Sequence, residues 1–320
     1  MMRQVLLNLF AMKKLMCLGS VTMITVLSGG TGTPKLLQGI KEIIKAKDLT
    51  VIVNTLENNY FSGVYVSADV DTVMYTLCDL INDKTWYGRV DDTFYTHEVL
   101  EELGFHETLR IGDKDRALKI QKTELLKEYS LQDVVKIQKN ALGIESTILP
   151  MSNTQPHVTI DTDEGMLSFH DFLITRQSKP HVNDVIYSPV EAADGVIESI
   201  ENSDTVIIGP SNPITSINPI INMPGVKKAL KNVYVTSVSP FISNNAISGP
   251  ASKFMMAKGY SNDCVGVASI YKDFLNHYII NNTDDKYKHI IENEIPKVSL
   301  ENIILKTMED KIKLAKMILE

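Results

Sequence analysis

The chain has 320 residues, a formal net charge of −7 and a sequence pI near 5.6. This acidic balance lacks the basic footprint of a nucleic-acid-binding protein, so we expect no nucleic-acid partner. Hydrophobic residues make up 44% of the chain, which suits one large α/β domain or a core with an insertion. Cys17, Cys78 and Cys264 are too scattered for a disulfide framework or a zinc site, and they fit a reducing cytoplasm.

The first residues have only some features of a secretory signal. Arg3 precedes an apolar run, 5–12, that is too short to span a bilayer, and no small-residue cleavage site follows it. A β-rich run then begins at Thr22. We therefore interpret residues 1–22 as a dispensable extension, with Met23 as a candidate natural start, and we expect a cytoplasmic protein without a membrane partner.

The stretch 22–35 is an apolar, β-rich run that breaks into glycines and then opens a helix. Glycines let backbone N–H groups approach an anion closely, and a helix N-terminus adds unpaired donors and a partial positive charge. Thr33 is the expected N-cap and Pro34 the first helical residue. The pattern predicts a phosphate-binding loop, with Gly29, Gly30, Thr31, Gly32, Thr33 and Lys35 as the binding residues.

This loop matches the named phosphate motifs only in part. A Walker A loop needs Gly-Lys-Ser/Thr, where this chain has Thr-Pro-Lys-Leu at 33–36. A dinucleotide fingerprint needs a third glycine, where Lys35 stands. Neither ordinary ATPase chemistry nor NAD binding is therefore expected, and a purely structural turn is the simpler alternative.

Two carboxylates follow the next predicted strand, Leu49–Thr55. Asp69 and Asp71 stand two residues apart at the start of a predicted helix that continues to Ile81. Acids in a first helical turn can simply complement the helix dipole. Beside a phosphate loop, the same pair can hold Mg²⁺ or orient a substrate hydroxyl, because a hard cation prefers oxygen ligands. Spacing alone leaves both interpretations open.

The middle of the chain departs from the alternation of strands and helices. Residues 82–110, rich in aromatics and acids, are expected to form an inserted, mostly helical region. A helix capped by Asp113 should follow. Its apolar positions are Ala117, Leu118, Ile120 and Leu125. Five of the seven residues in 110–116 are charged, which fits either a solvated helix start or a polar binding site.

Residues 131–176 predict a further helix and then strands, which together suggest a small α+β lobe. The predicted strands are 146–149, 157–160 and 166–174. From Asp194 the alternation of helices and strands resumes. Its expected parts are helix 195–201, strand 205–208, loop 209–216, helix 226–231, strand 233–238, loop 248–253 before another helix, a short strand 265–269, and a closing helix 304–319.

These patterns predict an α/β fold, a Rossmann-like, doubly wound, mostly parallel sheet with an inserted smaller α+β lobe. Residues 23–81 and 185–320 would form the nucleotide-binding core, and 82–184 the substrate-side lobe. Open α/β sheets bind ligands at the carboxyl ends of their strands. We therefore expect the loops 209–216 and 248–253 to converge on the glycine loop, with Gly209, Ser211 and Asn212 as nucleotide-binding residues.

Taken in order, the motifs of residues 23–320 resemble the 2-phospho-L-lactate transferases, the CofD-like family of deazaflavin coenzyme F420 biosynthesis. They are Ser-Gly-Gly-Thr-Gly-Thr-Pro-Lys-Leu-Leu at 28–37, Val-Asn-Thr at 53–55, Ser-x-Asp-x-Asp-Thr at 67–72, Asp-Thr-Phe at 92–94 with Thr-His-Glu at 96–98, Gly-Asp-Lys-Asp-Arg at 112–116, Gly-Pro-Ser-Asn-Pro-x-Thr-Ser at 209–216 and Ser-Gly-Pro-Ala at 248–251. Several motifs in order are more specific than any one loop.

The resemblance implies transfer of a 2-phospholactyl group from lactyl-2-diphospho-5'-guanosine to the deazaflavin FO, giving coenzyme F420-0 and GMP. Mg²⁺ is the implied cofactor, and a homodimer is the family's expected assembly. Asp71 and Arg110 match the family's FO-binding positions, and Asp69 and Asp71 match its acidic pair near the metal. Because phosphoryl transfer needs mostly positioning and charge stabilisation, Asp71 is the expected catalytic residue, orienting the attacking hydroxyl or accepting its proton.

The donor carries either lactate or enolpyruvate, and the sequence leaves this choice open. The family usually has Ala-Glu-Asp after Asn-Thr, where this chain has Leu-Glu-Asn at 56–58, so no metal role is expected of that loop. The alternative function is a non-catalytic, nucleotide-sugar-binding regulatory protein of the related gluconeogenesis-factor group, whose glycine loop is similar. The motifs at 112–116 and 209–213 favour the transferase, and release of GMP separates the two functions.

Overall fold

A computed structural model describes residues 23–243, 245–246 and 249–320. The expected extension, 1–22, and Ser248 of the third predicted loop lie outside the described residues. Within the described ranges, no helix has the length and apolar character needed to cross a membrane.

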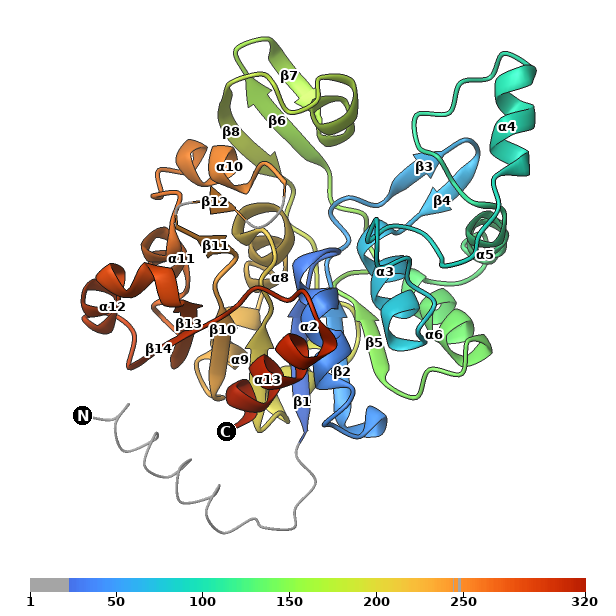
Figure 1. Ribbon diagram of the computed structural model, residues 1–320. Helices are drawn as coiled ribbons and strands as arrows, with labels where there is room; N and C mark the ends of the chain where they lie inside the picture. The colour runs from blue at the N-terminus through green and yellow to red at the C-terminus, as the bar shows by residue number, and fades with distance from the viewer. Residues whose placement is uncertain (1–22, 244, 247–248) are drawn as a thin grey trace.

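The centre of the molecule is a seven-stranded parallel sheet in the order β14-β13-β10-β9-β1-β2-β5 (Figure 1). Its strands are β1 (Ile24–Ser28), β2 (Leu49–Val53), β5 (Thr147–Pro150), β9 (Thr205–Ile208), β10 (Val235–Val238), β13 (His277–Asn281) and β14 (Lys297–Glu301). Every residue of β1 and β2 is buried, which explains their nearly continuous apolar sequence. The predicted doubly wound α/β fold is confirmed.

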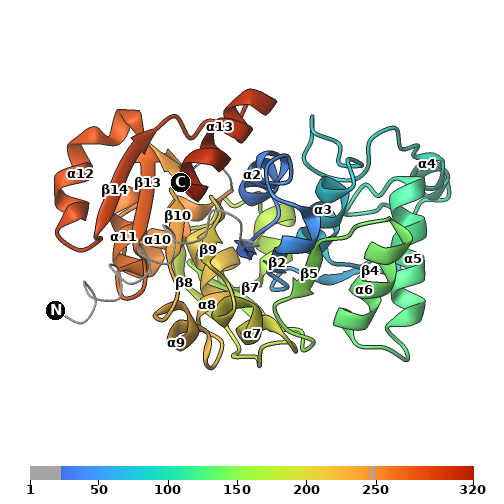
Figure 2. The same cartoon turned by 90° about the horizontal axis from the view of Figure 1, so that it is seen from below.

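Helices cover both faces of this sheet, as the view from below shows (Figure 2). One apolar core is shared with α2 (Gly32–Ile40), α3 (Ala68–Leu77), α6 (Leu131–Ala141) and α13 (Met308–Leu319). The core on the other face is shared with α7 (Val196–Glu201), α8 (Asn218–Ile221), α9 (Val226–Leu230), α10 (Ala251–Ala257), α11 (Cys264–Tyr271) and α12 (Asp285–Glu292). The remaining turns are η1 (Ala46–Asp48), η3 (Pro213–Ile217), η4 (Asn282–Asp284) and the hairpin of β11 (Phe241–Ile242) with β12 (Asn245–Ala246).

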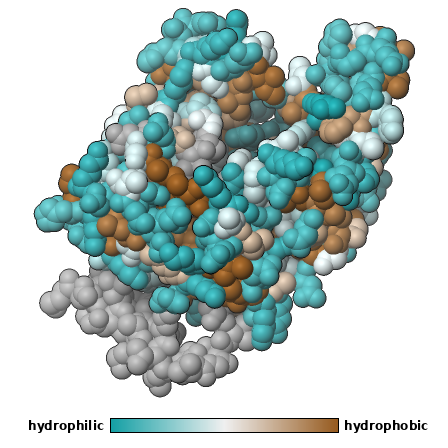
Figure 3. Space-filling model, in the orientation of Figure 1, coloured by the Kyte–Doolittle hydropathy of each residue, from teal (hydrophilic) through white to brown (hydrophobic). Residues whose placement is uncertain are grey.

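Two projections rise above the carboxyl ends of the central strands, and the surface is hollowed between them (Figures 1 and 3). The first, called the arm, contains β3 (Asn59–Phe61), β4 (Val64–Val66), α4 (Tyr95–Glu102) and α5 (Asp113–Leu125). The second, called the lobe, contains β6 (Val158–Thr162), β7 (Gly165–Ser168), η2 (Asp171–Thr175) and β8 (Val182–Tyr187). The rings of Phe61 in the arm and His170 in the lobe touch, with centroids 4.3 Å apart.

Several local predictions are corrected. Residues 265–269 are helical within α11, because Asp263 caps that helix by accepting from the Gly266 N–H at 2.9 Å and a short apolar run alone does not separate a strand from a buried helix. The strand expected at 146–149 is β5, which pairs with β2 in the main sheet instead of lying in the small lobe. The strand expected at 166–174 ends at Ser168 and is followed by η2.

The inserted region 82–110 contains one helix, α4, and is otherwise turns, so the expectation of a mostly helical segment is wrong. The hairpin β3–β4 and the strand β8 were not predicted from the sequence. The division of the chain into a core and a substrate-side lobe stays a prediction.

Candidate active site

The glycine loop, residues 29–31, follows β1 and lies against the loop that follows β9. The Gly29 N–H donates to the Ser211 Oγ at 3.1 Å, and the hydroxyls of Ser211 and Thr33 share a hydrogen bond of 2.7 Å. A Cβ on Gly209 would lie 2.2 Å from the Thr33 Oγ1, so glycine is needed for this approach. The predicted meeting of the two loops is confirmed, and their nucleotide stays a prediction.

Two further glycines admit close neighbours at the same place. A Cβ on Gly30 would lie 2.2 Å from the Asp69 Oδ1, and one on Gly32 would lie 1.8 Å from the Pro210 carbonyl oxygen. The glycine loop, Asp69 and the 209–216 loop therefore form one packed unit beyond the ends of β1 and β9.

Helix α2 begins at Gly32, and its N-cap, Thr31, makes no side-chain capping bond. Thr33 lies inside the first turn, not at the cap as predicted, because its hydroxyl is held by Ser211. An uncapped helix start offers backbone N–H donors and the positive end of the helix dipole to an anion. The half-buried Lys35 follows in the same helix, where burial lowers its pKa and its ammonium lies 5.1 Å from the centre of the Trp86 ring.

Asn212 shapes the loop after β9. Its Oδ1 accepts from the N–H groups of Ile214 and Thr215 at 3.0 and 3.3 Å, which starts the η3 turn. This bonding fixes the shape of the loop itself, and a contact between Asn212 and nucleotide stays a prediction.

Asp69 is buried, only 7% exposed, and faces the glycine loop. The Asn54 Nδ2 donates to its Oδ2 at 2.9 Å. Burial raises the pKa of Asp69 to about 6, although the Asn54 hydrogen bond opposes the rise. Burial and the nearby Asp69 charge also raise the pKa of Glu57 well above its ordinary value. Two carboxylates thus share this part of the site, and within the described ranges no cation is among the groups that shift the pKa of either one.

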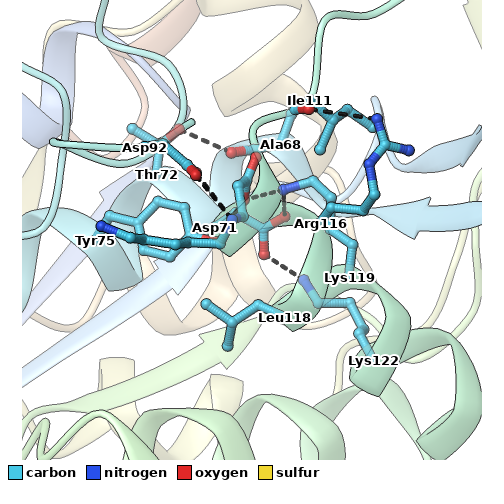
Figure 4. A network of polar contacts seen from close by, with 12 residues as sticks. Ala68, Asp71, Thr72, Tyr75, Asp92, Ile111, Arg116, Leu118, Lys119 and Lys122 are labelled. Carbon is cyan, nitrogen blue, oxygen red and sulfur yellow. Dashed lines mark hydrogen bonds and ion pairs between the residues drawn. The ribbon is translucent and has the colours of Figure 1, made fainter. Parts of the chain in front are cut away.

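Asp71 has the opposite surroundings, as Figure 4 shows. The Lys122 ammonium donates to its Oδ1, and the Lys119 ammonium lies 3.2 Å from its Oδ2. Burial alone would raise the pKa of Asp71, but the two ammoniums outweigh it and hold this pKa below its ordinary value. Asp71 is therefore an ionised, oriented carboxylate.

The two aspartates diverge because an α-helix turns by about 100° per residue, so positions two apart differ by about 200°. Asp69 consequently points to the glycine loop, while Asp71 points to helix α5. One turn of α3 thus places a carboxylate in each of two different sites. The sequence placed both acids at the helix start, which is confirmed, but it treated them as one pair.

Helix α5 buries a charged stripe. Of the four positions predicted to be its apolar face, Leu118 and Leu125 are half-buried and the other two are exposed. Ile120 is 50% exposed and Ala117 is also exposed. Its buried residues are Asp115, Arg116, Lys119 and Lys122. Lys119 pairs with Asp115 as well as with Asp71, and the Tyr75 hydroxyl donates to the Asp115 Oδ1 at 2.5 Å. Two ammoniums and two carboxylates balance in charge, which makes their burial tolerable.

The motifs at 92–98 and 112–116 hold the arm together, because an aspartate of each motif caps the helix that contains the other motif. The Asp92 carboxylate accepts from the backbone N–H groups of Lys114 and Asp115 at the start of α5. Asp113 accepts from the N–H groups of Tyr95 and Thr96 at the start of α4, which corrects its predicted role as the cap of its own helix. A Cβ on Gly112 would lie 2.4 Å from Asp92, so the glycine makes room for this exchange.

Arg116 and Arg110 have separate partners. The Arg116 Nη2 donates to both Glu107 oxygens at 3.0 and 2.8 Å, and His97 binds the same carboxylate at 2.9 Å. The exposed Arg110 stacks its guanidinium 3.9 Å from the centre of the Phe94 ring. Arg110 thus presents a flat cation on the arm, and its contact with FO stays a prediction.

A divalent cation fits the surroundings of Asp69 better than those of Asp71. The carboxylates of Asp69 and Glu57 lack a compensating charge, and their raised pKa values show the strain that a cation would relieve. Asp71 is already neutralised by two ammoniums. Across the described ranges, no group of three or more His, Cys, Asp or Glu side chains is arranged to hold a metal, so water and substrate oxygens would complete the sphere.

Sequence reasoning missed three residues of this site. Lys119 and Lys122 were not selected because their counter-charge, Asp71, comes from another helix. Glu57 was set aside with its loop, yet the Asp69 charge helps to raise the pKa of Glu57. The spacing Asp115, Lys119, Lys122 is the signal that was available.

Comparisons with known proteins agree on one family. The family model of the 2-phospho-L-lactate transferase CofD matches residues 24–314. The 2-phospho-L-lactate transferase of Methanothermobacter thermautotrophicus is 56% identical over 298 residues, covering 93% of this chain and 97% of that one. That of Methanocaldococcus jannaschii is 50% identical over 309 residues, covering 94% and 98%.

Solved structures of a UPF0052-family protein from Bacillus halodurans share the fold. One superposes with a TM-score of 0.62 at 17% identity, covering 93% of this chain and 99% of that one. A second has a TM-score of 0.63 at 16% identity and covers 94% and 100%. At this identity the likeness concerns the fold alone.

Proposed function

The chain belongs to the CofD family and is a transferase enzyme of coenzyme F420 biosynthesis, and on that premise we propose that it moves a 2-phospholactyl group from lactyl-2-diphospho-5'-guanosine to the deazaflavin FO. The products are coenzyme F420-0 and GMP. A bond forms between the FO ribityl oxygen and the phosphorus that carries lactate, the bond from that phosphorus to the GMP oxygen breaks, and the hydroxyl proton is lost.

The observation that carries this proposal is that one turn of α3 touches both halves of the site. Asp69 packs on the glycine loop, where the uncapped start of α2 suits the donor's diphosphate. Asp71 faces away toward the arm as an ionised carboxylate, which suits an attacking hydroxyl. Donor and acceptor would thereby be held at a fixed separation, and positioning is most of what phosphoryl transfer needs from a protein.

Each predicted residue receives a role in this proposal. The glycine loop and Lys35, with Gly209, Ser211 and Asn212, hold the guanosine diphosphate side. Arg110, stacked on Phe94, and Asp71 bind FO, and Asp71 orients the attacking hydroxyl. Mg²⁺ would be held by Asp69, with Glu57 nearby, and would neutralise charge on the diphosphate.

The test incubates the purified protein with FO, lactyl-2-diphospho-5'-guanosine and MgCl₂, and follows GMP by chromatography and F420-0 by mass spectrometry. We expect equal amounts of both products. The enolpyruvyl donor, assayed in parallel, gives the donor preference. Saturable binding of a nucleotide-sugar without GMP release would overturn the transferase proposal in favour of the regulatory function.

We also propose a homodimer in the cytoplasm. Helix α4 buries none of its residues. Its Tyr95 and Val99 and its C-cap Leu103 are 69%, 50% and 76% exposed, at the spacing of one helix face. A second copy would cover this apolar stripe. Light scattering should give the mass of two chains, and Leu103→Asp should give the mass of one. A monomeric wild type would contradict the proposal.

A further inference from the structure

Two lysines of α5 converge on one carboxylate of α3. Lys122 is fully buried and Lys119 is 2% exposed, and their ammoniums reach the two oxygens of Asp71 separately (Figure 4). Lys119 is shared with Asp115. Among the described residues, Asp71 is the one ion-pair partner that the structure gives Lys122.

Such an arrangement is costly to build. Burying an ammonium costs several kcal/mol even after relaxation, and a single lysine would already neutralise Asp71. An apolar side chain of similar length would pack α5 against α3 without that cost. Two lysines on one carboxylate therefore need a reason beyond joining the helices.

One oxygen of Asp71 keeps capacity to accept a further hydrogen bond. Its Oδ2 is buried and pairs with the Lys119 ammonium at 3.2 Å, and within the described part of the chain no other donor reaches it. Contacts on both oxygens also fix the rotation of the carboxylate about its Cβ–Cγ bond. The remaining acceptor position of Oδ2 thereby acquires a defined direction.

We propose that Lys119 and Lys122 are positioning residues that hold the Asp71 carboxylate in the orientation required by the acceptor hydroxyl. The inference rests on the proposed function, in which Asp71 receives that hydroxyl. The lysines touch no substrate and act through Asp71. They also keep Asp71 out of the cation site, which leaves Asp69 to serve the metal.

Lys122→Met tests this inference cleanly, because Lys122 serves Asp71 without the second pairing that Lys119 makes. The variant keeps the length of the side chain in an apolar form. We expect kcat to fall by about 10- to 100-fold, since small misplacements of a catalytic group have effects of this size. The KM for the guanosine donor should stay within about twofold, because the donor contacts lie on the glycine loop.

A double-mutant cycle separates positioning from general structural support. If Lys122 acts only through Asp71, Lys122→Met added to Asp71→Asn should lower kcat no further than Asp71→Asn alone, within about twofold. A purely structural role would make the two losses multiply. Lys122→Gln, which keeps a polar donor in the buried site, replaces Lys122→Met in the cycle if the latter does not fold.

The matched control is Gln138→Leu. Gln138 is buried on α6 and donates to the Leu118 carbonyl of α5 at 2.8 Å, so its loss weakens the support of the same helix without touching Asp71. Its kcat should remain within about twofold of wild type, as expected for a contact outside the reacting groups.

The outcomes are distinct. Multiplying losses in the cycle, or a fall of kcat in Gln138→Leu equal to that in Lys122→Met, would overturn the positioning role while leaving the transferase proposal intact. A wild-type protein that releases no GMP would overturn the proposed function, and with it the catalytic meaning of the lysines. Non-multiplying losses with an unaffected control support the inference.

Discussion

Asp69 and Asp71 stand two residues apart in the same helical turn, yet they have opposite electrostatic surroundings. Asp69 faces a glycine loop, an asparagine and a second carboxylate, and its pKa is raised to about 6. Asp71 faces two buried ammoniums, and its pKa is held below its ordinary value. The difference comes from helix geometry, which sends neighbouring acids to different partners.

This comparison suggests a division of labour. The Asp69 side is short of positive charge, so it suits a cation, through which the diphosphate of the donor would be held. The Asp71 side is complete in charge, so it suits a neutral hydroxyl that needs orientation. In this proposal the acidic pair serves two sites that share a helix, and the metal role that the family resemblance implies for Asp71 stays a prediction.

The largest expected effect is on turnover. Asp71→Asn removes the ionised acceptor and should lower kcat by about 10²- to 10⁴-fold, the usual contribution of a positioned proton acceptor. The affinity for Mg²⁺ should be retained, because the proposal assigns the cation to Asp69. Steady-state kinetics with FO as the varied substrate measure the first quantity, and a Mg²⁺ titration measures the second.

Asp79→Asn is the control for this change, since Asp79 follows the C-cap of the same helix and its exposed side chain pairs with Lys41. Its kcat should match wild type. Near-normal turnover in Asp71→Asn would show that Asp71 has no role in the reaction, and it would contradict the division of roles between Asp69 and Asp71.

The glycine loop tests the Asp69 side. Gly30→Ala places a methyl group where the Asp69 Oδ1 lies, 2.2 Å away, so either the loop or Asp69 must move. We expect the affinity for guanosine diphosphate to fall by about 10- to 100-fold, comparable to 1.4–2.8 kcal/mol of lost binding. Isothermal titration calorimetry measures it.

Gly112→Ala is the matched control, because its methyl group would strike Asp92 in the arm at a comparable distance, 2.4 Å. It should weaken the arm without changing guanosine diphosphate affinity. Equal losses in both variants would show that the glycine loop has no special link to the nucleotide.

The pH dependence of Mg²⁺ binding follows from the raised pKa of Asp69. A proton and a cation compete for the same carboxylate, so the apparent Mg²⁺ affinity should fall by up to about tenfold for each pH unit below about 6. Calorimetry with Mg²⁺ and guanosine diphosphate at pH 5, 6 and 7.5 tests this, with Asp69→Asn as the reference. A flat profile would place the cation elsewhere.

Local signals predicted the first β-α-β unit well. The β-branched strands, the glycines and the apolar spacing of α2 all lie within about thirty residues, so β1, α2 and β2 appear where expected. The apolar run 265–269 shows the limit of such signals, because a short buried helix and a buried strand look alike. Asp263, which caps α11, is the residue that separates the two.

The candidate site depended on pairings between distant segments. Thr33 was expected to cap its own helix, but Ser211, 178 residues away, takes its hydroxyl. Asp113 was recognised as a cap, but it caps α4 and leaves its own helix to Asp92. The charged start of α5 fitted either solvent or a binding site, because the counter-charge of its buried lysines, Asp71, comes from another helix. Composition and spacing do not contain these partners.

The smallest expected effect, and the most direct check of the comparison, is on stability in the absence of metal. The folded-state pKa of Asp69 lies above its ordinary value, so the folded protein binds more protons than the unfolded chain between about pH 4 and 6 and loses stability as pH rises through that window. Asp69→Asn removes this penalty. At pH 7.5 in EDTA it should be about 1–2 kcal/mol more stable than wild type.

Urea unfolding at pH 7.5 and pH 4.5 measures this difference, which should shrink at the lower pH. The pKa of Asp71 is shifted the other way, so its contribution is present above its unfolded pKa and is lost as pH falls. Asp71→Asn should therefore be less stable than wild type at pH 7.5, since it leaves buried ammoniums unpaired. Changes of the same sign in the two variants would show that the acids share one electrostatic environment, contrary to the geometry of α3.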